Sequence, residues 1–200
     1  FLAFKVPYLL TLMVSGALTA TFVPLFSYRL ALDRKREAWD LSINIGNIIF
    51  LVLIGVSVLL VIIAPWFIPL IGPGLGEETT AKGIFLFRIL MIGFVFEGLT
   101  GLVIGMLNSL RRFALAAFAP AAGTVITLVI TVLFARSLGI TSLAIAYVAG
   151  WVAGLIVLFP GLRGERINYR PRIDWHDPGV REVGGMVWPI LIGSAVGKVS

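Results

Sequence analysis

Long apolar windows alternate with short charged segments along the whole chain. A bilayer core needs roughly 20 apolar helical residues to cross about 30 Å, and most windows reach that length. Five complete spans and the beginning of a sixth are predicted, in the windows 5–29, 40–77, 83–110, 113–135, 137–162 and from 183 onward. The pattern therefore predicts an all-α, polytopic integral membrane bundle.

The composition excludes most soluble and enzymatic classes. Hydrophobic residues make up 59% of the chain and charged residues only 13%, whereas soluble domains are about 25% charged. With no Cys and with His176 as the single His, neither a disulfide framework nor a Cys/His zinc site is available. No phosphate-binding loop, nucleophile elbow or metalloprotease helix motif occurs. We therefore expect no cofactor, no metal and no enzymatic activity, and we interpret His176 as a solvated loop residue.

The Lys and Arg residues segregate between the connecting loops. Of the sixteen cations, eleven follow the first, third and fifth spans, and two lie in the loops between. The positive-inside rule places the eleven in the cytoplasm, so the first span runs inward and the sixth enters from the cytoplasm. The net charge of +6 thus reports orientation and requires no nucleic-acid partner.

Four charged residues lie within or at the edges of spans. A charge near the bilayer centre costs at least a few kcal/mol, so such residues usually face a cavity or a partner. A long side chain near a helix end can instead snorkel to the interface, which is a second reading for Arg88 and Lys198. The four residues are Lys5, Arg88, Glu97 and Lys198.

Glu97 lies near the middle of the third window, too deep for its short side chain to reach a headgroup. Helical geometry places Gly101, Gly105 and Asn108 on the same face. This face fits a cavity with a functional carboxylate, and it also fits a tight helix-packing seam of small residues. Arg88 precedes Glu97 by nine residues and is predicted on the opposite side of the helix.

Weaker signals have structural interpretations. Asn44 and Asn47 are interpreted as hydrogen-bonding partners between helices rather than as substrate contacts. Asp177 is predicted to cap a helix that starts at Pro178. The prolines that follow residue 64 are predicted to end the second helix and to shape an outer loop; they are Pro65, Pro69 and Pro73.

Several strings, taken in order, resemble one family. They are Phe4-Lys5-Val6-Pro7, the run from Gly16 to Pro24, Arg88-Ile89, Leu107-Asn108 with Arg112-Phe113, Ala117-Phe118-Ala119-Pro120, and the run from Arg170 to Arg181 before Trp188-Pro189. The set resembles the MurJ/MviN lipid II flippases of the multidrug/oligosaccharidyl-lipid/polysaccharide exporter superfamily. The resemblance implies a fourteen-helix, two-lobed protein of the bacterial cytoplasmic membrane. This chain would supply helices two to six (1–162), a basic cytoplasmic linker (163–182) and the start of helix seven (183–200).

The resemblance also implies a function. A lipid-linked peptidoglycan precursor would be flipped by alternating access, without covalent chemistry. Lys5 and Arg88 match basic positions of the family and would bind the lipid-linked pyrophosphate, and Lys198 would add charge. Independently of the resemblance, we hypothesise that Glu97, with Asn108 on its face, positions a cation or couples a monovalent ion or a proton.

Two departures from the family pattern leave alternatives open. An Arg-Arg pair of the family is replaced by Thr11 and Leu12, and Glu97 stands at a position that is usually apolar in the family. Another polyprenyl-linked or anionic lipid cargo, or a chain that has lost transport, is compatible with these departures. So are an ion-coupled small-molecule or polysaccharide-lipid exporter and a non-transporting scaffold that docks partners through Gly-rich faces.

Overall fold

The computed structural model describes residues 7, 20–74, 76–163, 165, 169 and 171–186 of the 200-residue chain. These residues form helices and connecting turns, and no strand occurs among them. The elements are α2 (Lys35–Ile71), α3 (Glu77–Ser109), α4 (Phe113–Leu138), α5 (Thr141–Leu158) and the short 3₁₀ helix η1 (Phe159–Leu162). Residues 20–31 and 178–186 are also helical.

Four helices are long and apolar enough to cross a membrane: α2, α3, α4 and the stretch Thr141–Leu162 that joins α5 to η1. They correspond to the second, third, fourth and fifth predicted spans. The predicted first span is described only at residue 7 and from residue 20 onward, and the predicted sixth only over 183–186.

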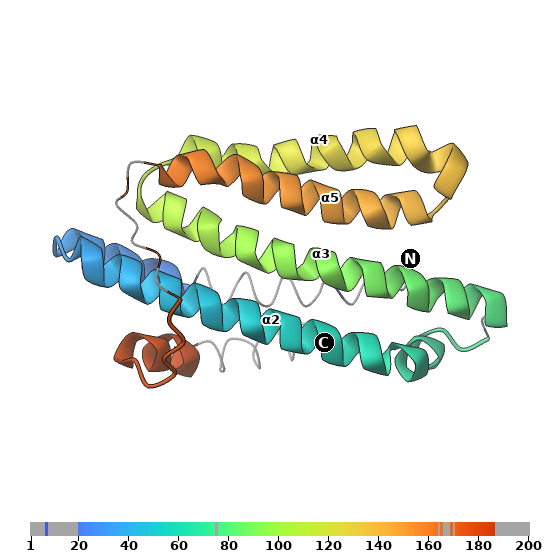
Figure 1. The fold of residues 1–200 in the computed structure, drawn as a ribbon, viewed down its shortest axis with the longest axis horizontal. Helices are drawn as coiled ribbons and strands as arrows, with labels where there is room; N and C mark the ends of the chain where they lie inside the picture. The colour runs from blue at the N-terminus through green and yellow to red at the C-terminus, as the bar shows by residue number, and fades with distance from the viewer. Residues whose placement is uncertain are drawn as a thin grey trace.

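The helices run antiparallel in chain order. Figure 1 shows α4 and α5 side by side, with α3 between that pair and α2. The turn from α3 to α4, the start of α2 and residues 171–177 lie at one end, and the α2–α3 and α4–α5 connections lie at the other (Figure 1). The first end carries the basic loops, so the fold gathers on one side those cations of the predicted cytoplasmic set that lie within the described residues.

The end of α2 differs from the prediction. The helix continues through Pro65 and Pro69 and ends at Ile71, where the N–H of Gly72 donates to the carbonyl of Ile68 at 3.1 Å. A proline removes one helical hydrogen bond, whereas ending a helix within the bilayer would leave several carbonyl groups without partners. Only the turn after Ile71, where Gly74 has φ +90°, fits the predicted loop.

Two glycines of α3 receive side chains from neighbouring helices. The side chain of Leu53 on α2 fills the space that a Cβ would occupy at Gly98. A Cβ at Gly105 would lie 2.9 Å from Cγ2 of Val23, in helix 20–31. Gly105 is therefore part of a helix-packing seam, the second of the two readings of its face.

A second seam joins α4 and α5. A Cβ on Gly123 would lie 2.7 Å from the carbonyl oxygen of Gly150, and one on Gly154 would lie 3.3 Å from that of Ala119. The hydroxyl of Thr127 bridges the pair by donating to the carbonyl of Ala146 at 3.2 Å. Small residues four positions apart on both helices allow the backbones to approach this closely.

Candidate functional site

The buried carboxylate of Glu97 has a partner on a different helix. Glu97 lies on α3 with 9% of its surface exposed, and the hydroxyl of Tyr147 on α5 donates a hydrogen bond to its Oε2. One turn earlier on α3, a Cβ at Gly93 would lie 2.6 Å from Cδ1 of Tyr147. The absence of a side chain at Gly93 therefore makes room for the ring that reaches Glu97.

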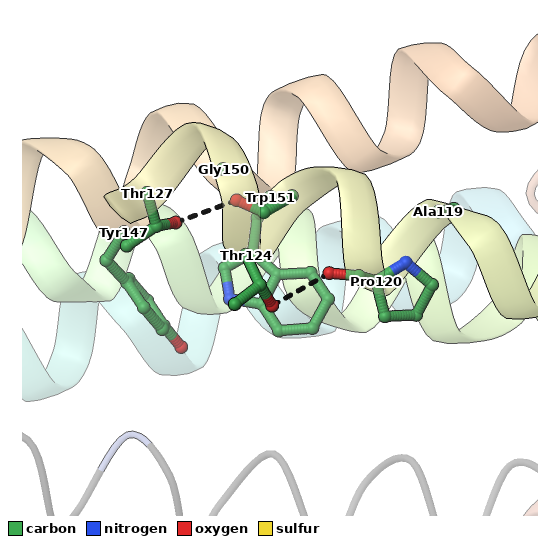
Figure 2. A pocket seen from close by; sticks show the side chains of 8 residues that line it. Ala119, Pro120, Thr124, Thr127, Tyr147, Gly150 and Trp151 are labelled. Carbon is green, nitrogen blue, oxygen red and sulfur yellow. Dashed lines mark hydrogen bonds between the residues drawn. The ribbon is translucent and has the colours of Figure 1, made fainter. Parts of the chain in front are cut away.

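Tyr147 also borders a cavity of about 240 Å³ between α4 and α5 (Figure 2). Its ring meets that of Trp151 edge to face, with centroids 6.3 Å apart. The residues that line the cavity are Ala119, Pro120, Gly123, Thr124, Thr127, Tyr147, Gly150 and Trp151. A single side chain thus connects the cavity wall to the buried carboxylate.

The hydroxyl groups in the cavity wall are engaged by the backbone. Thr124 donates to the carbonyl of Pro120 at 2.9 Å, and Thr127 donates to that of Gly123 at 3.0 Å (Figure 2). Aromatic rings, methyl groups and glycine backbone make up most of the remaining wall. The cavity is therefore largely apolar, but the oxygens of its threonine hydroxyls can still accept hydrogen bonds, for example from water.

Arg88 lies on the outward side of α3. It is exposed, as are its neighbours Phe85 (54%) and Ile92 (53%), whereas Glu97 is buried. Among the ion pairs of the described residues, none includes Arg88. The guanidinium is therefore available to a group outside the packed helices described here.

The other predicted site residues are distributed differently. Asn108 is half-buried near the inner end of α3, and its carbonyl accepts the N–H of Arg111 at 3.0 Å. Lys5 and Lys198 lie outside the described residues, as do Thr11 and Leu12. Of the predicted site, the structure therefore describes Arg88, Glu97 and Asn108, and it does not bring Arg88 and Glu97 to one face.

Asn44 and Asn47 hold the linker rather than a neighbouring helix, which corrects the prediction. Asn44, fully buried on α2, accepts the N–H of Asp174 at 2.8 Å and donates to the carbonyl of the same residue at 3.0 Å. Asn47 donates to the carbonyl of Arg172 at 3.0 Å and accepts the hydroxyl of Tyr169 at 3.0 Å. These side chains therefore satisfy backbone N–H and carbonyl groups in a segment that has no regular secondary structure.

Charged groups order the same segment. Arg172 donates to Oδ2 of Asp174 at 2.7 Å and lies 3.9 Å from a carboxylate oxygen of Asp177. The hydrogen bond from Arg172, with a second from the backbone N–H of His176, holds the pKa of Asp174 below its ordinary value. The N–H of Gly179 donates to Oδ1 of Asp177 at 2.9 Å, which confirms the predicted cap of helix 178–186.

His176 itself is exposed, as expected for a loop residue. No cluster of three or more His, Cys, Asp or Glu side chains that could hold a metal ion occurs within the described ranges.

Sequence reasoning missed Tyr147. The signal was present, because Tyr147 is the only titratable side chain in α5 and stands among small residues, four positions from Trp151. A polar aromatic tip in an apolar span needs a hydrogen-bond partner, and Glu97 is the only carboxylate between residues 83 and 162. Pairing the two required knowledge that α3 and α5 are neighbours.

Taken together, the antiparallel apolar helices and the one-sided basic loops define a multi-pass membrane protein. The family model of the lipid II flippase MurJ matches residues 1–200. The chain therefore belongs to the MurJ family.

Individual relatives agree with this assignment. A probable lipid II flippase MurJ of Rickettsia prowazekii is 27% identical over 203 residues, covering 100% of this chain and 40% of that protein. The lipid II flippase MurJ of Burkholderia cenocepacia is 28% identical over 213 residues with the same coverage. A solved structure of lipid II flippase MurJ in an inward closed conformation shares the fold, with a TM-score of 0.77 at 19% identity. It is matched over 100% of this chain and 41% of its own, so the chain spans about two fifths of the length of these relatives.

Proposed function

We propose that the protein containing this chain flips a lipid-linked peptidoglycan precursor, a lipid II-like polyprenyl diphosphate, across the bacterial cytoplasmic membrane by alternating access. The observation that carries the proposal is the family match over residues 1–200. In this proposal the chain forms most of one lobe, with five complete spans, a cytoplasmic linker at 163–182 and the start of a sixth span.

Arg88 is the proposed anchor for the anionic headgroup. A guanidinium forms paired hydrogen bonds with phosphate oxygens, and its charge offsets that of a diphosphate moving through an apolar layer. The exposure of Arg88 on α3 supports this role, because its side chain is not consumed by an ion pair within the described bundle. Lys5 and Lys198 are proposed to add positive charge along the same path.

The role of Arg88 is tested by charge reversal in the full-length protein. Arg88→Glu should abolish flipping of a fluorescent polyprenyl-diphosphate lipid in proteoliposomes, while Arg88→Lys should retain part of it. Arg136→Glu, at the opposite end of the bundle from the basic loops, serves as the matched control. Full activity of Arg88→Glu, with normal insertion, would remove Arg88 from the site.

A second candidate is ion-coupled export of a smaller molecule or of a polysaccharide lipid. The hydrogen bond between Tyr147 and Glu97 favours it, because an intramembrane carboxylate is a natural ion-coupling group. Competition between lipid II and soluble cationic compounds for binding to the purified protein separates the two functions. The scaffold alternative loses part of its basis, since Gly98 and Gly105 already receive side chains from within the lobe.

A further inference from the structure

Glu97 is far from either end of its helix. It precedes the last residue of α3, Ser109, by twelve positions, which corresponds to about 18 Å along the axis. It is also the only acidic residue between 83 and 162. Its presence at this depth calls for a partner or for a bound proton.

The groups that face Glu97 from the described helices are few. On α2, charged residues end at Asp40, and the residue that packs at neighbouring Gly98 is Leu53. Neither α4 before Arg136 nor α5 carries a charged side chain. On α3 itself, Arg88 lies nine residues away on the exposed side. Helix 20–31, which packs on α3 at Gly105, carries Tyr28 and Arg29 near its end. Tyr147 is the titratable group that α5 presents to Glu97.

The hydrogen bond between these two residues depends on the proton content of the carboxylate. When Glu97 is ionised, both of its oxygens can only accept, so its hydrogen bond with Tyr147 requires the Tyr147 hydroxyl to donate. When a proton from water binds the carboxylate, the negative charge disappears and Glu97 gains an O–H donor of its own. The remaining carbonyl oxygen can still accept from Tyr147, but the bond is then no longer assisted by charge and is weaker, so the contact between α3 and α5 differs in strength between the two states.

The cavity between α4 and α5 supplies a route. Its volume of about 240 Å³ exceeds the roughly 30 Å³ that one water molecule occupies in the liquid. Tyr147 forms part of its wall and contacts Glu97 with its hydroxyl. A proton that water delivers to the cavity is therefore separated from the carboxylate of Glu97 by the side chain of Tyr147 alone.

A metal cation fits less well than a proton. Hard cations such as Ca²⁺ collect six or more oxygen ligands. No group of three or more potential acidic or His ligands occurs in the part of the chain that the structure describes. The threonine hydroxyls of the cavity wall already donate to backbone carbonyls.

We propose that Glu97 and Tyr147 form a proton-binding site inside the membrane, reached through the cavity between α4 and α5, whose protonation changes the contact between α3 and α5. The consequence for transport rests on the proposed function. The proposal adds to that function the identity of the coupling ion, a proton. The binding of the proton itself does not depend on any cargo.

The first experiment therefore needs no cargo. Dicyclohexylcarbodiimide modifies protonated carboxyl groups in apolar surroundings, and its attachment is located by mass spectrometry of the full-length protein in proteoliposomes. We expect modification of Glu97 that falls about tenfold per pH unit above its midpoint, with little modification of exposed Glu77 and Glu78. In Tyr147→Phe the carboxylate loses its donor, so modification should persist to higher pH. Absence of modification at Glu97 at every pH, or identical pH profiles for wild type and Tyr147→Phe, would overturn the proposal.

The second experiment uses transport. Flipping by the wild-type protein should respond at least severalfold to an imposed pH gradient, and Glu97→Gln should lose the response. Glu77→Gln, which removes an exposed carboxylate from the outer end of the same helix, should keep it. A response to a sodium gradient alone that disappears in Glu97→Gln would replace the proton by a metal cation and overturn the proposal. If the wild-type protein flips no lipid at all, the proposed function fails, while the modification experiment still decides the proton site.

Discussion

The side-chain amide of Asn44 forms two hydrogen bonds with the backbone of Asp174, a residue 130 positions later in the chain. The Nδ2 group of Asn44 donates to the carbonyl of Asp174, and its Oδ1 accepts the N–H of the same residue. The side-chain amide thus satisfies both backbone groups, as a paired strand would. Because Asn44 is fully buried, the linker is fixed to the inner part of α2 at a point that water does not reach.

Asn44→Ala should release the linker from α2. Leaving a buried donor and acceptor without partners costs about 1–3 kcal/mol, which corresponds to roughly 5- to 150-fold faster exchange if the linker opens locally. Hydrogen–deuterium exchange of peptides that contain Asp174 measures the effect. Asn47→Ala, at a half-buried position, should give a smaller increase. Equal protection in Asn44→Ala and wild type would contradict the assigned role.

Acid should weaken the ordered structure of the linker, and the pH at which this happens should depend on Arg172. Because the pKa of Asp174 is lowered in the folded protein, its contribution is present above the ordinary Asp pKa of about 3.9 and is lost as the pH falls through the lowered value. Arg172→Gln removes the principal donor, so its linker should loosen at a higher pH than that of the wild type. Pepsin cleavage of the linker, followed across the acidic range in which pepsin is active and compared with the control variant at each pH, tests this. Arg163→Gln, which changes an exposed arginine at the same end, should behave as the wild type.

Arg112 and Arg111 should differ although each contributes one positive charge at the same end of the bundle. Arg112 donates to the carbonyls of Gly161 and Arg163 and to a carboxylate oxygen of Glu165 at 3.1 Å, whereas Arg111 is exposed. We expect Arg112→Gln to lower the free energy of unfolding by about 1–2 kcal/mol, the lower part of the range for bonds to charged groups because the side chain is partly exposed. Arg111→Gln should have little effect. Thermal unfolding of both variants in detergent provides the comparison, and matching midpoints would show that only charge matters.

Gly123→Ala should separate α4 from α5. The added methyl group would lie 2.7 Å from the carbonyl oxygen of Gly150, and such overpacking typically costs about 1–3 kcal/mol. Gly55→Ala on α2 is the matched control, because no atom lies within 4 Å of its added Cβ. A loss of thermal stability confined to Gly123→Ala is the expected result. A similar loss in both variants would contradict the assigned role of the α4–α5 contact, because Ala has the higher helix propensity and nothing opposes its methyl group at Gly55.

Much of the fold could be predicted from the sequence because membrane spans are set by length and polarity. The third and fourth spans were predicted to meet between residues 110 and 113, and α3 and α4 are separated by 110–112. Pro65 and Pro69 misled the prediction, since their effect on a helix depends on whether water or lipid surrounds it. That surrounding is a property of the folded protein in its membrane.

The site was less predictable for a geometric reason. Sequence periodicity placed Glu97 on a face of its own helix, and the face could be read in two ways. The structure assigns its Gly105 to packing and Glu97 to a contact with Tyr147. Asn44 and Asn47 were recognised as hydrogen-bonding residues, but their partner is an extended linker whose position no local pattern encodes. Partners more than a hundred residues apart become visible only when the helices are placed in space.

The small residues between α4 and α5 have two effects at once. Gly123 and Gly150 bring the two backbones together, and the same two residues line the cavity beside Tyr147. The cavity and the α4–α5 packing contact have the same cause. A residue without a side chain lets the neighbouring helix approach and also leaves space beside the contact. A mutation that plugs the cavity at either glycine must also push the helices apart, so the internal space can be altered independently only through Pro120, Thr124 or Trp151.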